Sequence, residues 1–145
     1  MKTLKDAFQE VTRISRDIEK LVKETRFEEY DDLSALSFSL DDPDHIQLWD
    51  EMKHILDRLN GIRHDVAYLN KGIIATGNLY KNSNGRYEAC GREFSSGSLI
   101  EALIDDGLFD SPRWEVSRIE HNGSDYYLYG HKEINLSGLE IRIRG

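Results

Sequence analysis

The sequence predicts an α+β protein with an N-terminal antiparallel helical hairpin and a small C-terminal antiparallel β-sheet or β-barrel domain. Two observations support this prediction. Apolar residues recur every three or four positions between residues 4 and 69, whereas residues 75–144 contain short segments separated by turns. The change near residue 72 divides the 145 residues into a helical part, 1–72, and a β-domain, 73–145.

The first predicted helix begins at residue 4. Thr3 and Asp6 can form a variant capping box, in which each side chain accepts the backbone N–H of the other residue. Charged residues of both signs occupy one face, which is typical of a helix with a solvated outer side. Apolar residues form a heptad seam on the other face, at spacings of 3, 4, 3, 4 and 3: Leu4, Ala7, Val11, Ile14, Ile18 and Leu21.

The second predicted helix begins at Asp42-Pro43, because aspartate accepts free N–H groups at a helix start and proline is favoured at the first helical position. Neither helix can bury its apolar stripe alone, so we expect the two to form an antiparallel hairpin. The stripe of the second helix again has spacings of three or four: Ile46, Trp49, Met52, Leu56, Leu59, Ile62, Val66 and Leu69.

The connection between the helices, roughly residues 27–40, is apolar. We expect it to pack against the helices, with a short helical turn around residues 28–36. Its apolar and aromatic residues are Phe27, Tyr30, Leu33, Leu36, Phe38 and Leu40.

The second half is divided by turns. Residues 82–85 (Asn-Ser-Asn-Gly) predict a β-hairpin, and Asn122-Gly123 predicts another turn. The apolar run at 99–104 can be a strand or one helical turn, and its length and flanking turns favour a strand. The last segment, 139–144, alternates apolar and charged residues. Five or six short strands fit a small, strongly bent sheet or a barrel.

The second half contains several short motifs. They are, in order, Gly77-Asn78-Leu79, Gly85-Arg86-Tyr87-Glu88, Ser96-Gly97-Ser98, Ile100-Glu101, Trp114, Arg118-Ile119-Glu120-His121, Asp125-Tyr126-Tyr127-Leu128 and Leu139-Glu140-Ile141-Arg142-Ile143-Arg144. In this order they resemble a bacterial family of small domains of unknown function, often found on plasmids, phages and integrative elements. The resemblance covers about residues 75–144. Because the family has no established activity, the resemblance implies a fold unit and supplies no functional residues.

The sequence lacks the residue patterns typical of an enzyme site. No nucleophile is accompanied by a base, and we interpret Cys90 as a half-buried residue at a strand end. No two of the five histidines lie three to five residues apart. A solvated loop explains the acidic cluster at 28–32 and a helix start explains the one at 41–45, with a cation site as the less favoured alternative at either. We therefore expect no catalytic residues, no metal and no other cofactor.

The second half also shares features with nucleic-acid-binding domains, because aromatic residues stand among basic ones. However, residues 73–145 contain 8 basic and 11 acidic side chains, a net charge of −3, and phosphate-binding surfaces normally have an excess of basic residues. We favour the interpretation in which the arginines pair with Glu101, Glu120 or Glu140 and the aromatic residues fill the core. The candidate binding surface consists of Arg118, Tyr127, Arg142 and Arg144.

The helical seam can be used within one chain or between two chains. Within one chain, the first helix covers the second helix and part of the sheet. Between two chains, surplus apolar surface joins two hairpins into a homodimer, and we favour this interpretation. The candidate self-association residues are Leu4, Val11, Ile14, Ile18 and Leu21.

Composition and charge complete the prediction. The chain is 39% hydrophobic and 32% charged with a net charge of −8, and its apolar runs are too short to cross a membrane. The apolar segment of a secretory signal is missing after Met1, so we expect a cytoplasmic protein. The predicted function is that of a non-catalytic interaction or accessory protein with a protein partner, and a nucleic-acid-associated factor is the alternative.

Overall fold

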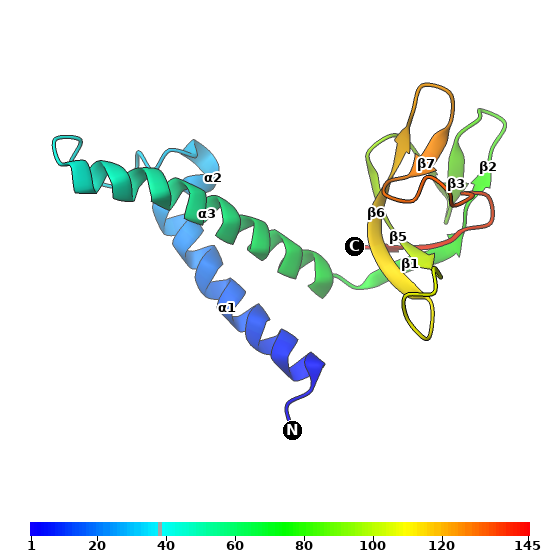
Figure 1. The fold of residues 1–145 in the computed structure, drawn as a ribbon, viewed down its shortest axis with the longest axis horizontal. Coiled ribbons are helices and arrows are strands. Elements are labelled where there is room, and N and C mark those ends of the chain that lie inside the picture. The colour runs from blue at the N-terminus through cyan, green and yellow to red at the C-terminus, as the bar shows by residue number, and fades with distance from the viewer. Residues whose placement is uncertain (38) are drawn as a thin grey trace. The chain divides into compact units, whose positions relative to one another are not determined.

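The computed structural model describes residues 1–37 and 39–145, and Phe38 of the connection lies outside the described residues. Backbone contacts divide the chain into two compact units, Met1–Asn70 and Lys71–Gly145, which we term the helical unit and the β unit. The described residues form three helices in the first unit and eight strands in the second (Figure 1). The predicted α+β class is confirmed.

The helix α1 spans Leu4–Thr25 and begins with the predicted capping box. The Thr3 hydroxyl accepts the Asp6 N–H at 3.0 Å, and the Asp6 carboxylate accepts the Thr3 N–H at 3.0 Å. At its other end, Arg26 adopts a left-handed conformation (φ 54°), and its N–H donates to the carbonyls of Lys23 and Val22. This turn ends α1 and leads directly into α2, which spans Phe27–Tyr30.

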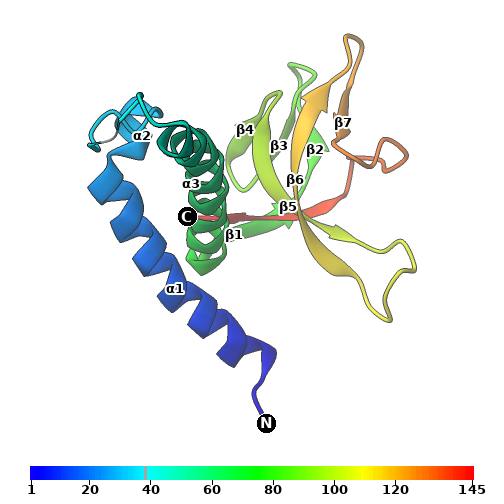
Figure 2. The same ribbon diagram turned by 60° about the vertical axis from the view of Figure 1, so that its left-hand side comes forward.

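The helix α3 spans Pro43–Asn70 and runs antiparallel to α1. The Asp42 carboxylate accepts the Asp44 N–H at 2.9 Å, as predicted for a helix start. Asn70 at the end of α3 donates its Nδ2–H to the Thr12 hydroxyl at 3.1 Å, which sets the register between the two helices. Both views show α2 beside the C-terminal end of α1 (Figures 1 and 2), and its Glu28 contacts Arg63 and His64 of α3.

The connection packs only in part as predicted. Phe27 and Leu33 are buried, but Leu36 and Leu40 are exposed, and the helical turn is limited to the four residues of α2. The described core of the helical unit is correspondingly small, and buried side chains from α1, the connection and α3 form it: Val22, Phe27, Leu33 and Leu56, with Ile18, Leu21, Trp49, Met52 and Leu59 half-buried around them.

The β unit consists of two antiparallel sheets. The apolar run at 99–104 belongs to a strand, as favoured by its flanking turns. The larger sheet has the order β1 (Ile73–Asn78), β8 (Glu140–Arg144), β5 (Ser98–Ile104), β6 (Arg113–His121) and β7 (Tyr126–Leu128). The smaller sheet has the order β2 (Tyr80–Lys81), β3 (Tyr87–Ala89) and β4 (Arg92–Phe94).

The sequence predicted either a sheet or a barrel for the β-domain, and the structure has an open sheet. Within the described residues, the edge strands β1 and β7 do not pair with each other, so the larger sheet does not close into a barrel. The core therefore lies between two sheets. Both sheets and two residues outside the strands, Leu79 and Leu136, contribute to it: Leu79, Tyr87, Ala89, Phe94, Ile100, Ala102, Ile104, Ile119, Leu128, Leu136, Ile141 and Ile143.

Cys90 differs from its prediction. We expected a half-buried residue at a strand end, but Cys90 is exposed in the two-residue turn that joins β3 and β4. Cys90 and Gly91 both have positive φ angles, 56° and 71°. Such a pair is typical of a tight hairpin turn whose twist matches that of the flanking strands. Cysteine is not a usual residue for this turn, which is why the sequence did not predict it.

Candidate functional site

The apolar residues of α3 form a wider stripe than α1 can cover. Seven of them follow a heptad repeat at spacings of 4 and 3: Leu48, Met52, Ile55, Leu59, Ile62, Val66 and Leu69. Alternate members, Met52, Leu59 and Val66, are buried or half-buried. The other four have side chains that are 38 to 61% exposed, at a regular spacing of seven residues. Half of a heptad stripe is thus left facing solvent in this structure.

The apolar residues of α1 are likewise divided between half-buried and exposed positions. Of the five predicted self-association residues, Ile18 and Leu21 are half-buried against the core of the helical unit. The other three, Leu4, Val11 and Ile14, are 42 to 87% exposed. The structure therefore separates the predicted set into two residues that help hold the hairpin together and three that remain accessible.

The exposed stripe of α3 and Ile14 of α1 lie on the same side of the hairpin. In each helix an exposed residue directly precedes one that faces the other helix: Ile14 precedes Ser15, and Ile55 precedes Leu56. In an antiparallel pair this places the two exposed residues on one side. We term this surface the apolar face, and it consists of Ile14, Leu48, Ile55, Ile62 and Leu69. Leu4 and Val11 lie outside it, because they share the heptad position of Ile18 and are exposed near the end of α3.

The opposite side of the hairpin is covered by α2. Glu28 of α2 accepts a hydrogen bond from Arg63 Nη2 at 2.5 Å and lies 3.1 Å from His64 Nε2. A hydrogen bond from Asn60 is the main reason that the pKa of Glu28 is lowered, and the charges of Arg63 and His64 act in the same direction. Asn60 and His64 project from α3 on the side away from Ile62. The helix α2 thus covers part of this flank, around residues 60–64, while the apolar face remains open.

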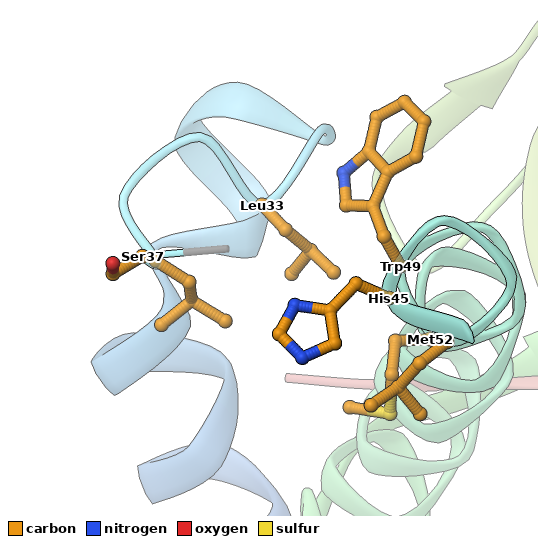
Figure 3. Close-up of a pocket in the computed structure, with 7 residues that line it drawn as sticks. Leu33, Ser37, His45, Trp49 and Met52 are labelled. Carbon is orange, nitrogen blue, oxygen red and sulfur yellow. The ribbon is translucent and has the colours of Figure 1, made fainter. Parts of the chain in front are cut away.

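A pocket of about 270 Å³ continues the apolar face at the end where α3 begins. Figure 3 shows Leu33, His45 and Met52 pointing toward this hollow, with Trp49 at its rim. Trp49 is held there because its indole N–H donates to the Asp32 carbonyl at 3.0 Å. Leu48 lines the pocket and is also the first α3 residue of the apolar face, so the two features form one continuous apolar surface.

The predicted nucleic-acid surface is brought together by the larger sheet. Strand pairing places Arg118, Tyr127, Arg142 and Arg144 on one face, opposite the face that packs into the core. Tyr127 is half-buried, and its ring lies 5.4 Å from Lys132 Nζ. The four residues therefore share a face although they come from three strands.

The three arginines of that surface each contact a carboxylate on the same face. Arg142 Nε donates to Glu101 at 2.7 Å, and Arg144 Nε donates to the other oxygen of the same carboxylate. Glu101 is only 2% exposed, and the Arg142 guanidinium lies 4.4 Å from the Trp114 ring centroid above it. Arg118 Nε donates to Glu120 at 2.6 Å. Two of the three glutamates proposed as partners from the sequence thus hold these arginines.

The loop between β5 and β6 presents a second exposed apolar feature. Leu108 and Phe109 are 70% and 63% exposed at its tip. Arg113 clamps the loop by donating to both oxygens of Asp106, at 2.7 and 3.0 Å. This hydrogen bonding lowers the pKa of Asp106 to about 2. The two apolar residues at the tip cover far less surface than the apolar face of the helical unit.

Residues 1–37 and 39–145 contain neither a metal-binding cluster nor a membrane-spanning helix. No group of three or more histidine, cysteine, aspartate or glutamate side chains is arranged to hold a metal ion. No helix in the described part of the chain is long and apolar enough to cross a membrane.

Comparison with known proteins identifies the second half only. A family model described as a domain of unknown function (DUF5348) matches residues 77–143, which agrees with the resemblance seen in the sequence motifs. This domain covers the β unit except its first six and last two residues and includes neither α1 nor α3. No curated protein and no solved structure matches the chain.

Proposed function

We propose that this protein acts by binding and not by catalysis, as an interaction or accessory protein whose helical unit provides the binding surface. The supporting observation is the apolar face, which places five large apolar side chains on one side of a helical hairpin. Contiguous rows of exposed apolar side chains are typical of protein–protein interaction sites. The partner of such a face is a helical surface, because heptad spacing fits side chains of another helix between its own.

The charge balance on the outer face of the β unit also supports this proposal. The face bearing Arg118, Arg142 and Arg144 also bears Glu101, Glu120 and Glu140, so three positive charges meet three negative ones. A phosphate-binding surface depends on uncompensated positive charge. The nucleic-acid-associated factor therefore remains the alternative function, supported by the shared face of the four predicted residues and opposed by this charge balance.

The experiment is an affinity capture from host lysate with matched variants of the full chain. The double variant Ile55→Glu/Ile62→Glu places two charges in the apolar face, whereas Ala67→Glu places one on the other flank of α3. We expect proteins captured by the wild type and by Ala67→Glu to be lost with the double variant. Capture that is identical for all three chains would contradict the proposal.

A nuclease treatment of half of each lysate tests the alternative. Partners of the apolar face survive nuclease because they contact protein directly. Captured proteins that disappear after nuclease, or nucleic acid recovered equally by all three chains, would instead favour the nucleic-acid-associated function of the β unit.

A further inference from the structure

We propose that the pocket at the start of α3 binds a basic amphipathic helix of a partner protein, which inserts one large apolar side chain into the pocket and sets lysine or arginine side chains against the carboxylates around it. This inference rests on the proposed function, because it names the chemistry of a partner that binds the helical unit. Three features of the pocket support it: its size, its fixed walls and the charge of the chain that forms it.

The pocket has the size of a single side chain. Its volume is about 270 Å³, and five of the seven residues that line it are apolar. An apolar cavity of about 150 Å³ already holds a benzene-sized ring, whereas most small-molecule sites measure about 300 to 1,000 Å³. One aromatic or large aliphatic side chain of a partner therefore fits this hollow better than a cofactor does.

Hydrogen bonds hold two walls of the pocket in place. The Trp49 indole N–H donates to the Asp32 carbonyl at 3.0 Å, and the Leu36 N–H donates to the Leu33 carbonyl at 2.9 Å. Figure 3 shows Met52 on the side of α3, where its flexible side chain can adapt to the shape of the occupant. A pocket whose walls are fixed before binding loses little conformational entropy when it is filled, which favours binding.

The chain that forms the pocket is strongly acidic. Residues 27–52 contain nine aspartate and glutamate residues and no lysine or arginine. Three of the nine are paired, namely Glu28, Glu29 and Asp50. The other six are exposed and have no ion pair to a described residue: Asp31, Asp32, Asp41, Asp42, Asp44 and Glu51. A concentration of uncompensated negative charge attracts a basic partner and repels an acidic one.

Two of these carboxylates lie beside the apolar residue that leads out of the pocket. Asp44 and Glu51 are about one helical turn before and after Leu48, on the same side of α3. Leu48 lines the pocket, and Ile55 follows it seven residues later on the apolar face. A helix that places its apolar side chains along Leu48 and Ile55 therefore meets carboxylates beside them. The same charges disfavour an anionic membrane surface and the pocket region of a second copy.

The first test identifies the chemistry of the occupant. A phage library of random peptides, each long enough for about four helical turns, is selected on the full chain and counter-selected on Leu48→Ser. This variant removes an apolar lining side chain without a change of charge, and Leu48 is 61% exposed, so circular dichroism is expected to show an intact fold. We expect the enriched peptides to combine lysine or arginine with large apolar residues spaced three or four apart. Enriched peptides that are neutral or acidic, or no enrichment above the starting library, would overturn the proposal.

The second test measures the affinity of one selected peptide for the pocket. In a Trp114→Phe chain, the fluorescence comes from Trp49 alone, which lines the pocket. We expect the peptide to change this fluorescence and Leu48→Ser to weaken binding roughly tenfold, because less apolar surface is buried. Binding that is equally tight in Leu48→Ser would place the peptide elsewhere and overturn the choice of pocket.

The third test removes charge beside the pocket. Asp44→Asn/Glu51→Gln is expected to weaken binding of the same peptide roughly fivefold and to make its affinity less dependent on salt concentration. Asp105→Asn/Asp110→Asn makes the same change of net charge at two exposed residues of the β unit, and is expected to leave the affinity unchanged. Equal losses in the two double variants would show that the peptide responds to net charge only, and would overturn the role of the carboxylates beside the pocket.

The inference and the proposed function fail in different ways. Peptide affinity that falls as the chain concentration rises would assign the pocket to a second copy of the chain and overturn the basic partner. If no basic peptide is selected but Ile55→Glu/Ile62→Glu abolishes capture of proteins from lysate, the helical unit has a partner of other chemistry and the proposed function stands. If neither peptide binding nor capture responds to the variants of the helical unit, both are wrong.

Discussion

The two units of this protein differ in how completely they bury their own apolar residues. Among the described residues, the β unit gathers twelve buried apolar side chains in its core, whereas the helical unit gathers four. The units have similar lengths, 75 and 70 residues. Two sheets facing each other can enclose a core between them, but two helices bury only the stripe along their single line of contact.

Buried charge is found in the β unit. Glu101 is 2% exposed and holds two arginines, Arg142 and Arg144, so its partners lie inside the unit. In the helical unit, the ion pairs lie at the surface, as between Glu28 and Arg63. The β unit thus encloses the larger core, while the helical unit leaves the apolar face exposed.

The largest expected effect on the free energy of unfolding comes from an isoleucine-to-alanine substitution made in each unit. Ile119 of the β unit is fully buried, and Ile119→Ala is expected to lower the free energy of unfolding by about 4 kcal/mol. Ile62 is 46% exposed, and Ile62→Ala is expected to cost less than about 1 kcal/mol where the chain is monomeric. The chain has one tryptophan in each unit, so urea unfolding followed in a Trp49→Phe or a Trp114→Phe background reports on one unit at a time.

Equal losses from these two substitutions would break the comparison between the units. They would mean that Ile62 is as well packed in the isolated chain as Ile119, and that the helical unit needs no partner. A small loss from Ile62→Ala at low concentration that grows at high concentration would sharpen the comparison, because it locates the missing contacts between chains.

The second expected effect tests whether the ion pairs of Glu101 with Arg142 and Arg144 stabilise the β unit. Glu101→Gln keeps the shape of the side chain but leaves Arg142 and Arg144 without their shared carboxylate. We expect a loss of about 2 kcal/mol, below the range for fully buried pairs because the two arginines retain some contact with water. Glu140→Gln, an exposed glutamate on the same face, is the control and is expected to change stability by less than about 0.5 kcal/mol. Similar values for both would show that the arginines do not depend on Glu101.

The sequence predicted the features that depend on neighbouring residues. The Thr3–Asp6 capping box, the helix start at Asp42 and the alternating strand at 139–144 are all local patterns, and the structure has each of them. Local patterns are set by backbone geometry over a few residues, so a single sequence is sufficient to recognise them.

The candidate site could be predicted only in part. Periodicity shows that α3 is apolar over a wide angle, but it does not show which edge α1 covers, so Ile55 and Leu56 could not be told apart. The partners of Glu101 were named from the sequence only among several alternatives, because they depend on the pairing of β5 with β8, about 40 residues later. These features depend on tertiary packing, which a repeat in one chain leaves open.

The third expected effect is a dependence of stability on protein concentration in one unit only. If the helical unit dimerises, its unfolding followed by Trp49 gains about 1.4 kcal/mol per mole of dimer for each tenfold rise in concentration. The β unit, followed by Trp114, is expected to show no change. Ile62→Glu is expected to remove the dependence from the Trp49 signal. A dependence that is equal in both units would assign the association to the whole chain.

The smallest expected effect concerns the loop between β5 and β6, where a surface ion pair holds Leu108 and Phe109 in place. Hydrogen bonding to Arg113 lowers the pKa of Asp106 from 3.8 to about 2 in the folded chain. Because the folded pKa is the lower one, the pair stabilises the fold above about pH 4, and this contribution is lost as the pH falls toward 2.

In the Trp49→Phe background, we therefore expect the urea midpoint of the β unit to fall less steeply between pH 4 and pH 2 in Asp106→Asn than in the parent chain. Asp110→Asn changes an aspartate of the same loop that has no ion pair to a described residue, and its profile should follow the parent. The difference is small because the pair lies at the surface, where water screens it. Parallel profiles for all three chains would mean that Arg113 does not hold the loop, and Leu108 and Phe109 would then belong to a mobile tip within the otherwise self-sufficient β unit.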